Sequence, residues 1–240
     1  MNVGLILATY REELNIKELL NSIFNNLNVS KVVIVDDSPK NLIQGIISNF
    51  DNIIYIHRGK KLGRGSAVIT GIKEILNYSE VNIIIEIDTD LSHDPGEIPD
   101  NLKKFKEENL DLLISSRYLK GSKVLNWSLN RRLFSRFANF LTRLLLGVPV
   151  SDYTNGFRIY SRKAATHITK NCGFIGNGFM ILSEILVELY YNKFKVAETK
   201  TIWRNRIRGK STVNLKLILD SLIELFKIYK RKKLIELKKL

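Results

Sequence analysis

The first half of the chain contains five short, mostly apolar runs, and these constrain the fold more than any other feature. Apolar residues fill consecutive positions in each run instead of alternating with polar ones, which is typical of strands buried on both faces of a sheet. The runs lie at 3–8, 31–37, 52–57, 81–88 and 111–117. Segments with helical spacing lie between them, at 12–27, 40–50, 63–77 and 96–108. This alternation predicts an α/β fold with a Rossmann-like, mostly parallel sheet and helices on both faces.

Length and cysteine content set further limits. The chain has 240 residues, of which 45% are hydrophobic, enough for one sizeable domain. Its single cysteine, Cys172, excludes an internal disulfide framework and suits a reducing compartment. The first residues read as a strand and not as a signal peptide, and no run reaches about 18 uninterrupted apolar residues. We therefore expect no transmembrane helix.

Polar side chains stand where the predicted strands end. They are Thr9 and Tyr10 after the first run, Asp36 and Asp37 at the second, Asp88 and Asp90 at the fourth, and Arg117 at the fifth. The carboxyl ends of parallel strands meet at one edge of a sheet, where ligands bind in such folds. One aspartate at a strand end is ordinarily a cap for the next helix. Two pairs of aspartates with an arginine indicate a functional cluster.

The stretch Asp88-Thr89-Asp90 sharpens this interpretation. Two carboxylates one residue apart repel each other and lose hydration when a strand end is enclosed, so a positive partner or water is expected beside them. A metal ion and a nearby Arg or Lys both satisfy this need. Hard divalent cations such as Mg²⁺ or Mn²⁺ take one or two carboxylates and fill their other positions with phosphate oxygens and water.

Charge is divided unevenly along the chain. Residues 1–120 contain 14 Lys/Arg and 17 Asp/Glu, a net charge of −3, whereas residues 121–240 contain 24 and 7, a net charge of +17. A basic half indicates a polyanionic partner such as nucleic acid, anionic lipid or a phosphorylated substrate, although a solvated lysine-rich surface would have the same composition. We expect no nucleic acid, because no basic motif is interleaved with exposed aromatic residues and the acidic cluster would repel phosphates unless filled by metal.

Two basic amphipathic segments lie in the second half. In 131–146 the apolar side chains fall on one side, at positions 133, 134, 137, 140, 141, 144 and 145. The tail from about 213 repeats the pattern and ends in "KRKKLIELKKL". Such helices often lie in a membrane interface, and the alternative is that each packs its apolar stripe on the sheet. We accordingly expect a catalytic domain over 1–212 and a basic amphipathic C-terminal helix over 213–240.

A series of motifs matches one enzyme family in order along the chain. They are "ATYREELNI" (8–16), "VDDSP" (35–39), "KKLGRGSAVITG" (60–71), "IDTDLSHDP" (87–95), "SSRYLKGS" (115–122), "RRLFSRFANFL" (131–141), "SDYTNGFRIY" (151–160) and "RIRGKS" (206–211). The chain resembles the family 2 glycosyltransferases, and among them the dolichol-phosphate mannose synthases. The resemblance implies a GT-A type fold and inverting transfer of mannose from GDP-mannose to dolichyl (polyprenyl) phosphate. A glucosyltransferase that uses UDP-glucose, or another family 2 enzyme, is the alternative.

The resemblance also implies a role for each matched residue. Ala8, Tyr10, Glu12, Val35 and Asp37 would hold the nucleotide base and ribose, with support from Asp36. Asp88, Thr89 and Asp90 would lie under the ribose and diphosphate, and Asp88, Asp90 and Ser92 would be at the Mg²⁺ or Mn²⁺ ion. Arg117, Arg131 and Ser135 would meet the acceptor phosphate, and Arg206 and Lys210 the donor diphosphate. Asp90, Arg117, Arg131 and Ser135 thus form the expected catalytic set.

The chain departs from the family pattern at several positions. Ala8 and Arg11 stand where the family usually has Pro and Asn, and the lysine of its G-E-S-K motif is replaced by Thr212, with Lys210 two residues earlier. Which of the two meets the donor stays open. Some relatives append transmembrane helices. Here the amphipathic segments, or a small membrane partner protein, would hold the enzyme peripherally at the cytoplasmic face of a membrane.

The proposed acceptor also fits the residue content. A phosphate monoester is already anionic near neutral pH, with a second pKa of roughly 6, so it needs positioning and not deprotonation. The chain has three histidines and 38 Lys and Arg residues, and this content suits such an acceptor.

Overall fold

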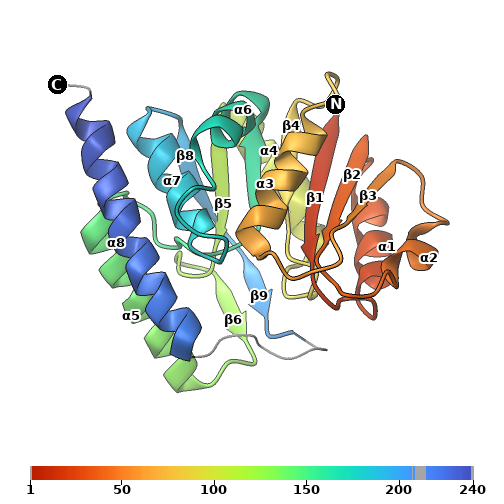
Figure 1. Ribbon diagram of the computed structural model, residues 1–240, viewed down its shortest axis with the longest axis horizontal. Coiled ribbons are helices and arrows are strands. Elements are labelled where there is room, and N and C mark those ends of the chain that lie inside the picture. Colours follow the sequence, from red (N-terminus) through yellow and green to blue (C-terminus); the bar gives the residue numbers. More distant parts are fainter. Residues whose placement is uncertain (1, 207, 209–214, 239–240) are drawn as a thin grey trace.

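A seven-stranded sheet forms the centre of the computed structural model, which describes residues 2–206, 208 and 215–238 (Figure 1). The strand order is β3-β2-β1-β4-β7-β5-β8. The strands are β1 (Val3–Thr9), β2 (Lys31–Asp36), β3 (Ile53–His57), β4 (Ile83–Glu86), β5 (Leu112–Ser116), β7 (Arg158–Ser161) and β8 (Val196–Lys200). All five predicted strands are present, so the unalternating apolar runs identified them correctly.

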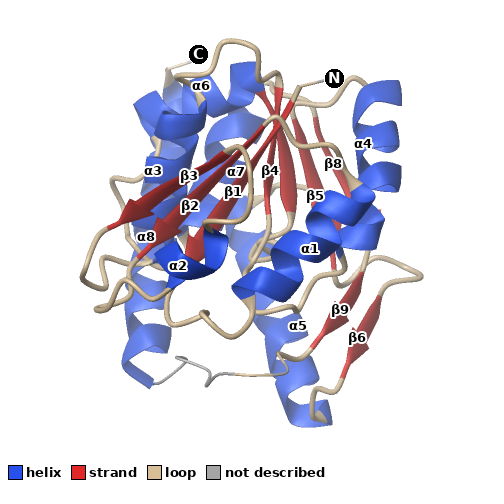
Figure 2. Cartoon of the chain, turned by 90° about the vertical axis from the view of Figure 1, so that its right-hand side faces the viewer, coloured by secondary structure: helices blue, strands red, loops and turns tan. Residues whose placement is uncertain are grey.

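Helices cover both faces of the sheet, as predicted (Figure 2). One face carries α1 (Ile16–Asn26), α2 (Ile43–Ile47), the short 3-10 helix η1 (Pro95–Glu97) and α4 (Ile98–Glu107). The other carries α3 (Arg64–Ile75), α6 (Arg162–Asn171) and α7 (Ile181–Tyr191). Each layer buries a separate apolar cluster against the sheet. Burial on both sides explains why apolar residues in these strands follow one another without alternating with polar ones.

Strand β7 runs antiparallel between β4 and β5 and is not among the predicted strands. Ile159 of β7 pairs with Ile85 on one side and with Leu113 on the other. Two antiparallel pairings in succession leave β4 and β5 pointing the same way. The carboxyl ends of β1, β2, β4 and β5 therefore still meet at one edge, as the sequence predicts.

Helix α5 (Leu129–Leu146) faces outward with its apolar side. Its inward side buries Asn139, Thr142 and Leu146. The exposed side chains are Leu133, Phe134, Phe137, Phe140, Leu141 and Leu144. The alternative that this helix packs its apolar stripe on the sheet is therefore wrong.

Helix α8 (Leu215–Leu237) packs on α7 and lies beside α5 (Figure 1). Its Ile228 is fully buried in the core, and Arg231 Nε lies 3.1 Å from a carboxylate oxygen of Glu188 on α7. Its exposed apolar side chains are Leu219, Leu222, Ile223, Phe226, Leu234 and Leu237. We call the exposed apolar side chains of α5 and α8 the outer face. None of the helices in the described ranges is long and apolar enough to cross a membrane.

A two-stranded ribbon lies below the main sheet. It pairs β6 (Lys123–Leu125) with β9 (Ile202–Arg204) in parallel. The predicted boundary between a catalytic domain and a tail, at 212/213, lies outside the described residues and stays a prediction.

Candidate active site

The strand ends bring the predicted polar residues to one edge of the sheet. Thr9 of β1 stands opposite Asp36 of β2 in register, and the stretch that follows β4 crosses beside them. The Thr89 hydroxyl donates to the Ala8 carbonyl at 3.3 Å, which ties the Asp88–Asp90 loop to the end of β1. The site is therefore built on rigid strands.

The aspartates that follow β2 are bound into the scaffold. Asp36 is fully buried and accepts hydrogen bonds from the Ser38 backbone at 2.9 Å, the Ser38 hydroxyl at 2.5 Å and the Tyr55 hydroxyl at 2.8 Å. This geometry fits the supporting role expected of Asp36.

Asp37 fixes the turn that begins α3. One of its oxygens accepts from Arg58 Nε at 2.5 Å, and the other accepts from the backbone N–H groups of Leu62 and Gly63 at 2.8 and 2.9 Å. Gly63 has a φ of 101°, and a side chain there would clash with the Asn177 carbonyl. The nucleotide contact expected of Asp37 is not tested by this geometry.

Asp88 is held by two cationic or proton-donating side chains that sequence reasoning did not single out. Arg64 reaches it through Nη2 at 2.7 Å and Nε at 3.1 Å, and His93 Nε2 lies 3.3 Å away. Burial alone would raise the pKa of Asp88, but the Arg64 charge and the His93 hydrogen bond outweigh it and hold the pKa well below its usual range. Asp88 is thus ionised and fixed in orientation.

Glu86 completes this network from inside β4. It is 1% exposed, accepts from the Tyr160 hydroxyl at 2.7 Å and places Oε1 2.7 Å from Arg64 Nη2. The sequence does carry a signal for it, because Glu86 interrupts an otherwise apolar strand. A charge inside a buried strand needs a partner, and Arg64 supplies it.

Asp90 faces a different cation. Its Oδ2 lies 3.2 Å from Arg206 Nη2, and its Oδ1 accepts from the Ser92 backbone N–H at 3.1 Å. Leu91, between them, has a φ of 60°, an unfavourable backbone region for leucine that is retained where the surroundings enforce it. The Ser92 side chain is nearly fully buried. The loop therefore presents the Asp90 carboxylate at the cost of local strain.

The donor set at this loop fits a hard cation with few protein ligands. Carboxylate oxygens are the ligands that Mg²⁺ and Mn²⁺ prefer, and Asp90 is bound by only one guanidinium contact that the structure records. Asp88 would have to share its oxygens with Arg64 and His93. Within the described residues no group of three or more His, Cys, Asp or Glu side chains is arranged to hold a metal. A cation here would depend on phosphate oxygens and water for most of its coordination.

Glu12 lies near the same loop and titrates close to neutral pH. Burial raises its pKa to about 7, opposed by a hydrogen bond from Asn15 at 2.5 Å and reinforced by the Asp90 charge. The loop between β1 and α1 thus adds a carboxyl group that changes its charge near pH 7.

Three arginines converge beside these carboxylates. Arg117 makes a bidentate pair with the buried Asp152, at 2.7 and 2.8 Å, and also donates to Thr154 at 2.9 Å. Arg206 lies against Asp90. Arg131 has no carboxylate partner in the described part of the chain. It reaches the Asn205 side-chain oxygen at 3.4 Å and stacks over the Trp127 ring at 4.3 Å.

The charges of these groups act on one another. Burial, and then the charges of Arg206 and Arg117, lower the pKa of Arg131, and the Asp90 carboxylate partly offsets them. A further anion beside Arg131 would reduce the remaining repulsion among the three cations. Ser135, also predicted at this place, has its hydroxyl 2.5 Å from the Tyr118 hydroxyl.

The remaining predicted residues divide into those the structure places and one it does not describe. Tyr10 is flanked by the side chains of Lys61 and Arg11, 4.7 and 5.3 Å from its ring centre. The Val35 side chain is buried in the core, so only its backbone could meet a nucleotide. Lys210 lies outside the described residues.

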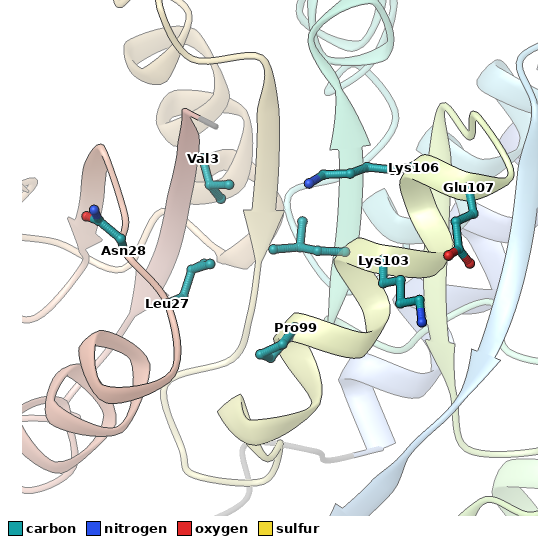
Figure 3. A pocket seen from close by; sticks show the side chains of 8 residues that line it. Val3, Leu27, Asn28, Pro99, Lys103, Lys106 and Glu107 are labelled. Atoms are coloured by element: carbon teal, nitrogen blue, oxygen red, sulfur yellow. The ribbon is translucent and has the colours of Figure 1, made fainter.

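A cavity of about 560 Å³ lies away from this site, at the opposite edge of the sheet (Figure 3). It is lined by Val3 at the start of β1, by Leu27 and Asn28 after α1, and by α4 residues including Lys103, Lys106 and Glu107. The polar cluster at the strand ends, and not this hollow, carries the chemistry described above.

The fold and the strand-end carboxylates define a GT-A type protein, the architecture of nucleotide-sugar glycosyltransferases. Among solved structures, glucosyl-3-phosphoglycerate synthase from Mycobacterium tuberculosis, in complex with Mn²⁺, UDP-glucose and phosphoglyceric acid, superposes with a TM-score of 0.69. It is 17% identical, and the match covers 95% of this chain and 80% of that one. At this identity the likeness concerns the fold.

The sequence comparisons are more specific. The model of glycosyl transferase family 2 matches residues 5–169, so the chain belongs to that family. A dolichol-phosphate mannosyltransferase of Pyrococcus furiosus is 34% identical over 238 residues, which cover 96% of this chain and 64% of that protein. A polyprenol monophosphomannose synthase of Mycolicibacterium smegmatis is 28% identical over 214 residues, covering 87% and 80%. The chain thus spans just under two thirds of the Pyrococcus protein.

Proposed function

We propose that the protein transfers mannose from GDP-mannose to dolichyl (polyprenyl) phosphate with inversion at the anomeric carbon. The observation that carries the proposal is the position of Arg131, 4.3 Å above Trp127 and close to Arg117 and Arg206, beside the Asp90 carboxylate. A guanidinium without a carboxylate partner in the described ranges suits a phosphate, which it can bind through two parallel hydrogen bonds. The names of the two sequence relatives support the choice of mannose and of a polyprenyl acceptor.

The reaction needs no general base in this arrangement. An oxygen of the acceptor phosphate attacks the anomeric carbon, the bond from that carbon to the donor diphosphate breaks, and nucleoside diphosphate leaves. The attacking oxygen is already ionised near neutral pH, so the protein has to align it and screen its charge. Arg117 and Arg131 would hold the acceptor phosphate, with Ser135 as a further donor. The bidentate pair with Asp152 fixes the orientation of the Arg117 guanidinium.

The donor would lie across the strand ends. Tyr10, Glu12, Asp37 and the backbone of Ala8 and Val35 would bind the base and ribose, and Thr89 would lie beneath them. Arg206 would neutralise charge on the leaving diphosphate, with Lys210 or Thr212 as a further contact.

Asp90 and Asp88, with Ser92, would hold Mg²⁺ or Mn²⁺. Such an ion stabilises the charge that develops on the leaving diphosphate. Because Arg64 and His93 already fix Asp88, Asp90 is expected to be the stronger ligand of the two.

The outer face would place the active site at a membrane surface. Exposed Phe134, Phe137 and Phe140 on α5 lie near arginines of the same helix, which is the composition of an interfacial helix. Docking would be peripheral, at the cytoplasmic face. A small membrane partner protein is the alternative occupant of this face.

A radiochemical assay tests the proposed reaction. Purified protein is incubated with polyprenyl phosphate, Mn²⁺ and either labelled GDP-mannose or labelled UDP-glucose, and label is counted in the organic phase. Label from GDP-mannose alone is the expected result. Label from UDP-glucose alone would replace the mannosyl proposal by the glucosyl alternative, and label from neither would overturn both.

A further inference from the structure

One flank of α5 carries a small cavity outside the site described above. Its volume is about 280 Å³, and it is lined by Tyr118, Arg136, Asn139, Phe140, Arg143 and Ser151. Arg136 and Arg143 are seven residues apart, so they project from the same side of the helix two turns apart. Drug-sized ligands fill pockets of roughly 300–1,000 Å³, so this volume suits a headgroup and not a whole lipid.

The two arginines in the cavity differ from the other arginines nearby. Arg117 pairs with Asp152, Arg206 with Asp90, and Arg132 donates to the Val124 carbonyl at 2.8 Å. Neither Arg136 nor Arg143 donates to, or pairs with, any group in the part of the chain that the structure describes. Two uncompensated guanidinium groups around one hollow favour an anion between them.

The other polar groups of the cavity wall already have hydrogen-bond partners within the protein, so the two arginines remain available for a ligand. The Asn139 side chain donates to the Ser135 carbonyl and accepts from the Tyr153 backbone, both at 2.9 Å. Two carboxylates lie near this wall within the described ranges. Asp152 pairs with Arg117, and Glu198 accepts from the backbone N–H groups of Ser151 and Asp152, at 2.7 and 3.0 Å.

Tyr118 lines this cavity and also contacts two residues of the proposed acceptor site. Its ring lies 5.3 Å from the Arg117 guanidinium, and its hydroxyl lies 2.5 Å from that of Ser135. Burial raises the pKa of Tyr118, while Arg117 and, more weakly, Arg136 lower it. Because neither Arg117, Arg131 nor Ser135 lines the cavity, an anion beside Arg136 would be a different anion from the one proposed at the acceptor site.

The cavity opens beside the outer face. Phe140 lines it and is 60% exposed, and the exposed Phe137 and Leu144 follow on the same helix. Arginines at the border of an apolar face that enters a bilayer lie at the depth of lipid phosphates. Both the charge and the depth thus match a lipid headgroup.

We propose that the cavity between Arg136 and Arg143 binds the phosphate of an anionic phospholipid that is not the acceptor. The site would recognise a phosphate group, beyond the general attraction of a basic surface for negative lipids. The proposal rests on the membrane docking of α5 but not on the transfer reaction.

Vesicle binding by the full chain tests this. One vesicle type contains phosphatidylcholine with phosphatidylglycerol, and the second replaces the latter by oleate at an equal measured zeta potential. The test variant is Arg136→Gln with Arg143→Gln. The control variant, Lys227→Gln with Lys230→Gln, removes the same charge from exposed positions of α8 that do not line this cavity.

The expected result is a preference of the wild type for phosphatidylglycerol over oleate of about tenfold, the size of one charge-assisted hydrogen bond. The control variant should bind both vesicle types more weakly but keep the preference. The arginine variant should lose it, while transfer to detergent-dispersed polyprenyl phosphate stays at the wild-type rate.

Two results would overturn the site specifically: no preference in the wild type, or equal loss of preference in both variants. Absence of binding to every vesicle would overturn the site together with the docking of α5. Activity in detergent separates that outcome from a failure of the proposed reaction.

Discussion

The strand-end carboxylates and several arginines of the second half lie side by side, but they differ in how their charges are paired within the protein. Asp36, Asp37 and Asp88 each have two or more partners within the protein, at 2.5 to 3.3 Å. Arg131, Arg136 and Arg143 have no carboxylate partner within the described ranges. The first region is organised before any ligand arrives, whereas these three arginines of the second remain available for anions that come from outside.

The same contrast holds for apolar surface. In the first region the apolar side chains of the sheet and its covering helices are buried. On α5 and α8 they are exposed while polar Asn139 and Thr142 face inward. Large exposed apolar side chains on two neighbouring helices are typical of an interaction site. One region thus completes its own contacts, whereas the other leaves arginines and apolar side chains exposed, which is what the proposed acceptor and membrane docking require.

The largest effect is expected at Asp90. Replacing Asp90 by Ala should lower the rate of transfer at least about a hundredfold, because the metal that binds the diphosphate loses a ligand. The fold should stay intact. Circular dichroism checks the fold, and Asp100→Ala, at an exposed position of α4, is the matched control. EDTA should stop the wild type, and Mg²⁺ or Mn²⁺ should restore it. Near-normal turnover of Asp90→Ala in metal-replete buffer would remove the metal from this loop.

The next prediction distinguishes Arg117 from Arg131 by what each contributes to stability. Asp152→Ala leaves Arg117 buried without its counter-ion and should lower the free energy of unfolding by about 3–5 kcal/mol. Arg131→Lys should leave stability unchanged, since Arg131 has only a long contact to Asn205 and the Trp127 face to lose. Urea unfolding of both variants measures this. Equal destabilisation would show that Arg131 is a structural residue.

Exposed phenylalanines give a smaller and more localised effect. Phe134→Ser with Phe137→Ser should weaken vesicle binding by about tenfold or more, since burial of even one phenyl ring in lipid is worth about 1.5–3 kcal/mol. Stability should not change, because both rings are exposed. Leu42→Ser is the control, because Leu42 is 51% exposed at the start of α2, on the face of the sheet that α8 does not cover. If all three changes act alike, the outer face has no special part in docking.

The smallest expected effect is a pH dependence. The pKa of Glu12 is raised to about 7 in the folded protein, so its protonated form is favoured by folding. Its contribution to stability is complete below the ordinary glutamate pKa of 4.5 and is lost as the pH rises through about 7. Glu12→Gln should therefore lose less stability than the wild type between pH 5 and 8. Glu184, whose pKa is also raised to about 7, titrates in both proteins and cancels from the difference. Parallel curves of Tm against pH would contradict this.

Much of the first region could be predicted from sequence because its signals are local. Consecutive apolar residues locate a buried strand, and the residue after it locates the strand end. Strand β7 gives no such signal, since its Arg158 reads as a surface residue. That guanidinium is in fact fully buried and donates to the carbonyls of Tyr153, Asn155 and Leu182, at 2.7 to 2.9 Å. Such partners are created by the fold and leave no pattern in the sequence.

The candidate site shows the same limit. The Asp-x-Asp stretch and the arginines could be found by residue type and position. Their internal partners could not, because Asp152 lies 35 residues from Arg117 and Arg64 lies 24 residues from Asp88. The exposure of the α5 phenylalanines was also undetermined, since an amphipathic pattern shows that a helix has two sides without showing which side faces the sheet.

The central claim is that the two regions bind different substrates, and equilibrium binding tests it most directly. Binding of GDP with Mg²⁺ and of a short-chain prenyl phosphate is measured separately by calorimetry, for the wild type, Asp90→Ala and Arg131→Lys. We predict that Asp90→Ala loses GDP but keeps the prenyl phosphate, and that Arg131→Lys keeps GDP but binds the prenyl phosphate at least about tenfold more weakly. Loss of both ligands in either variant, with the fold intact, would contradict the division of the site.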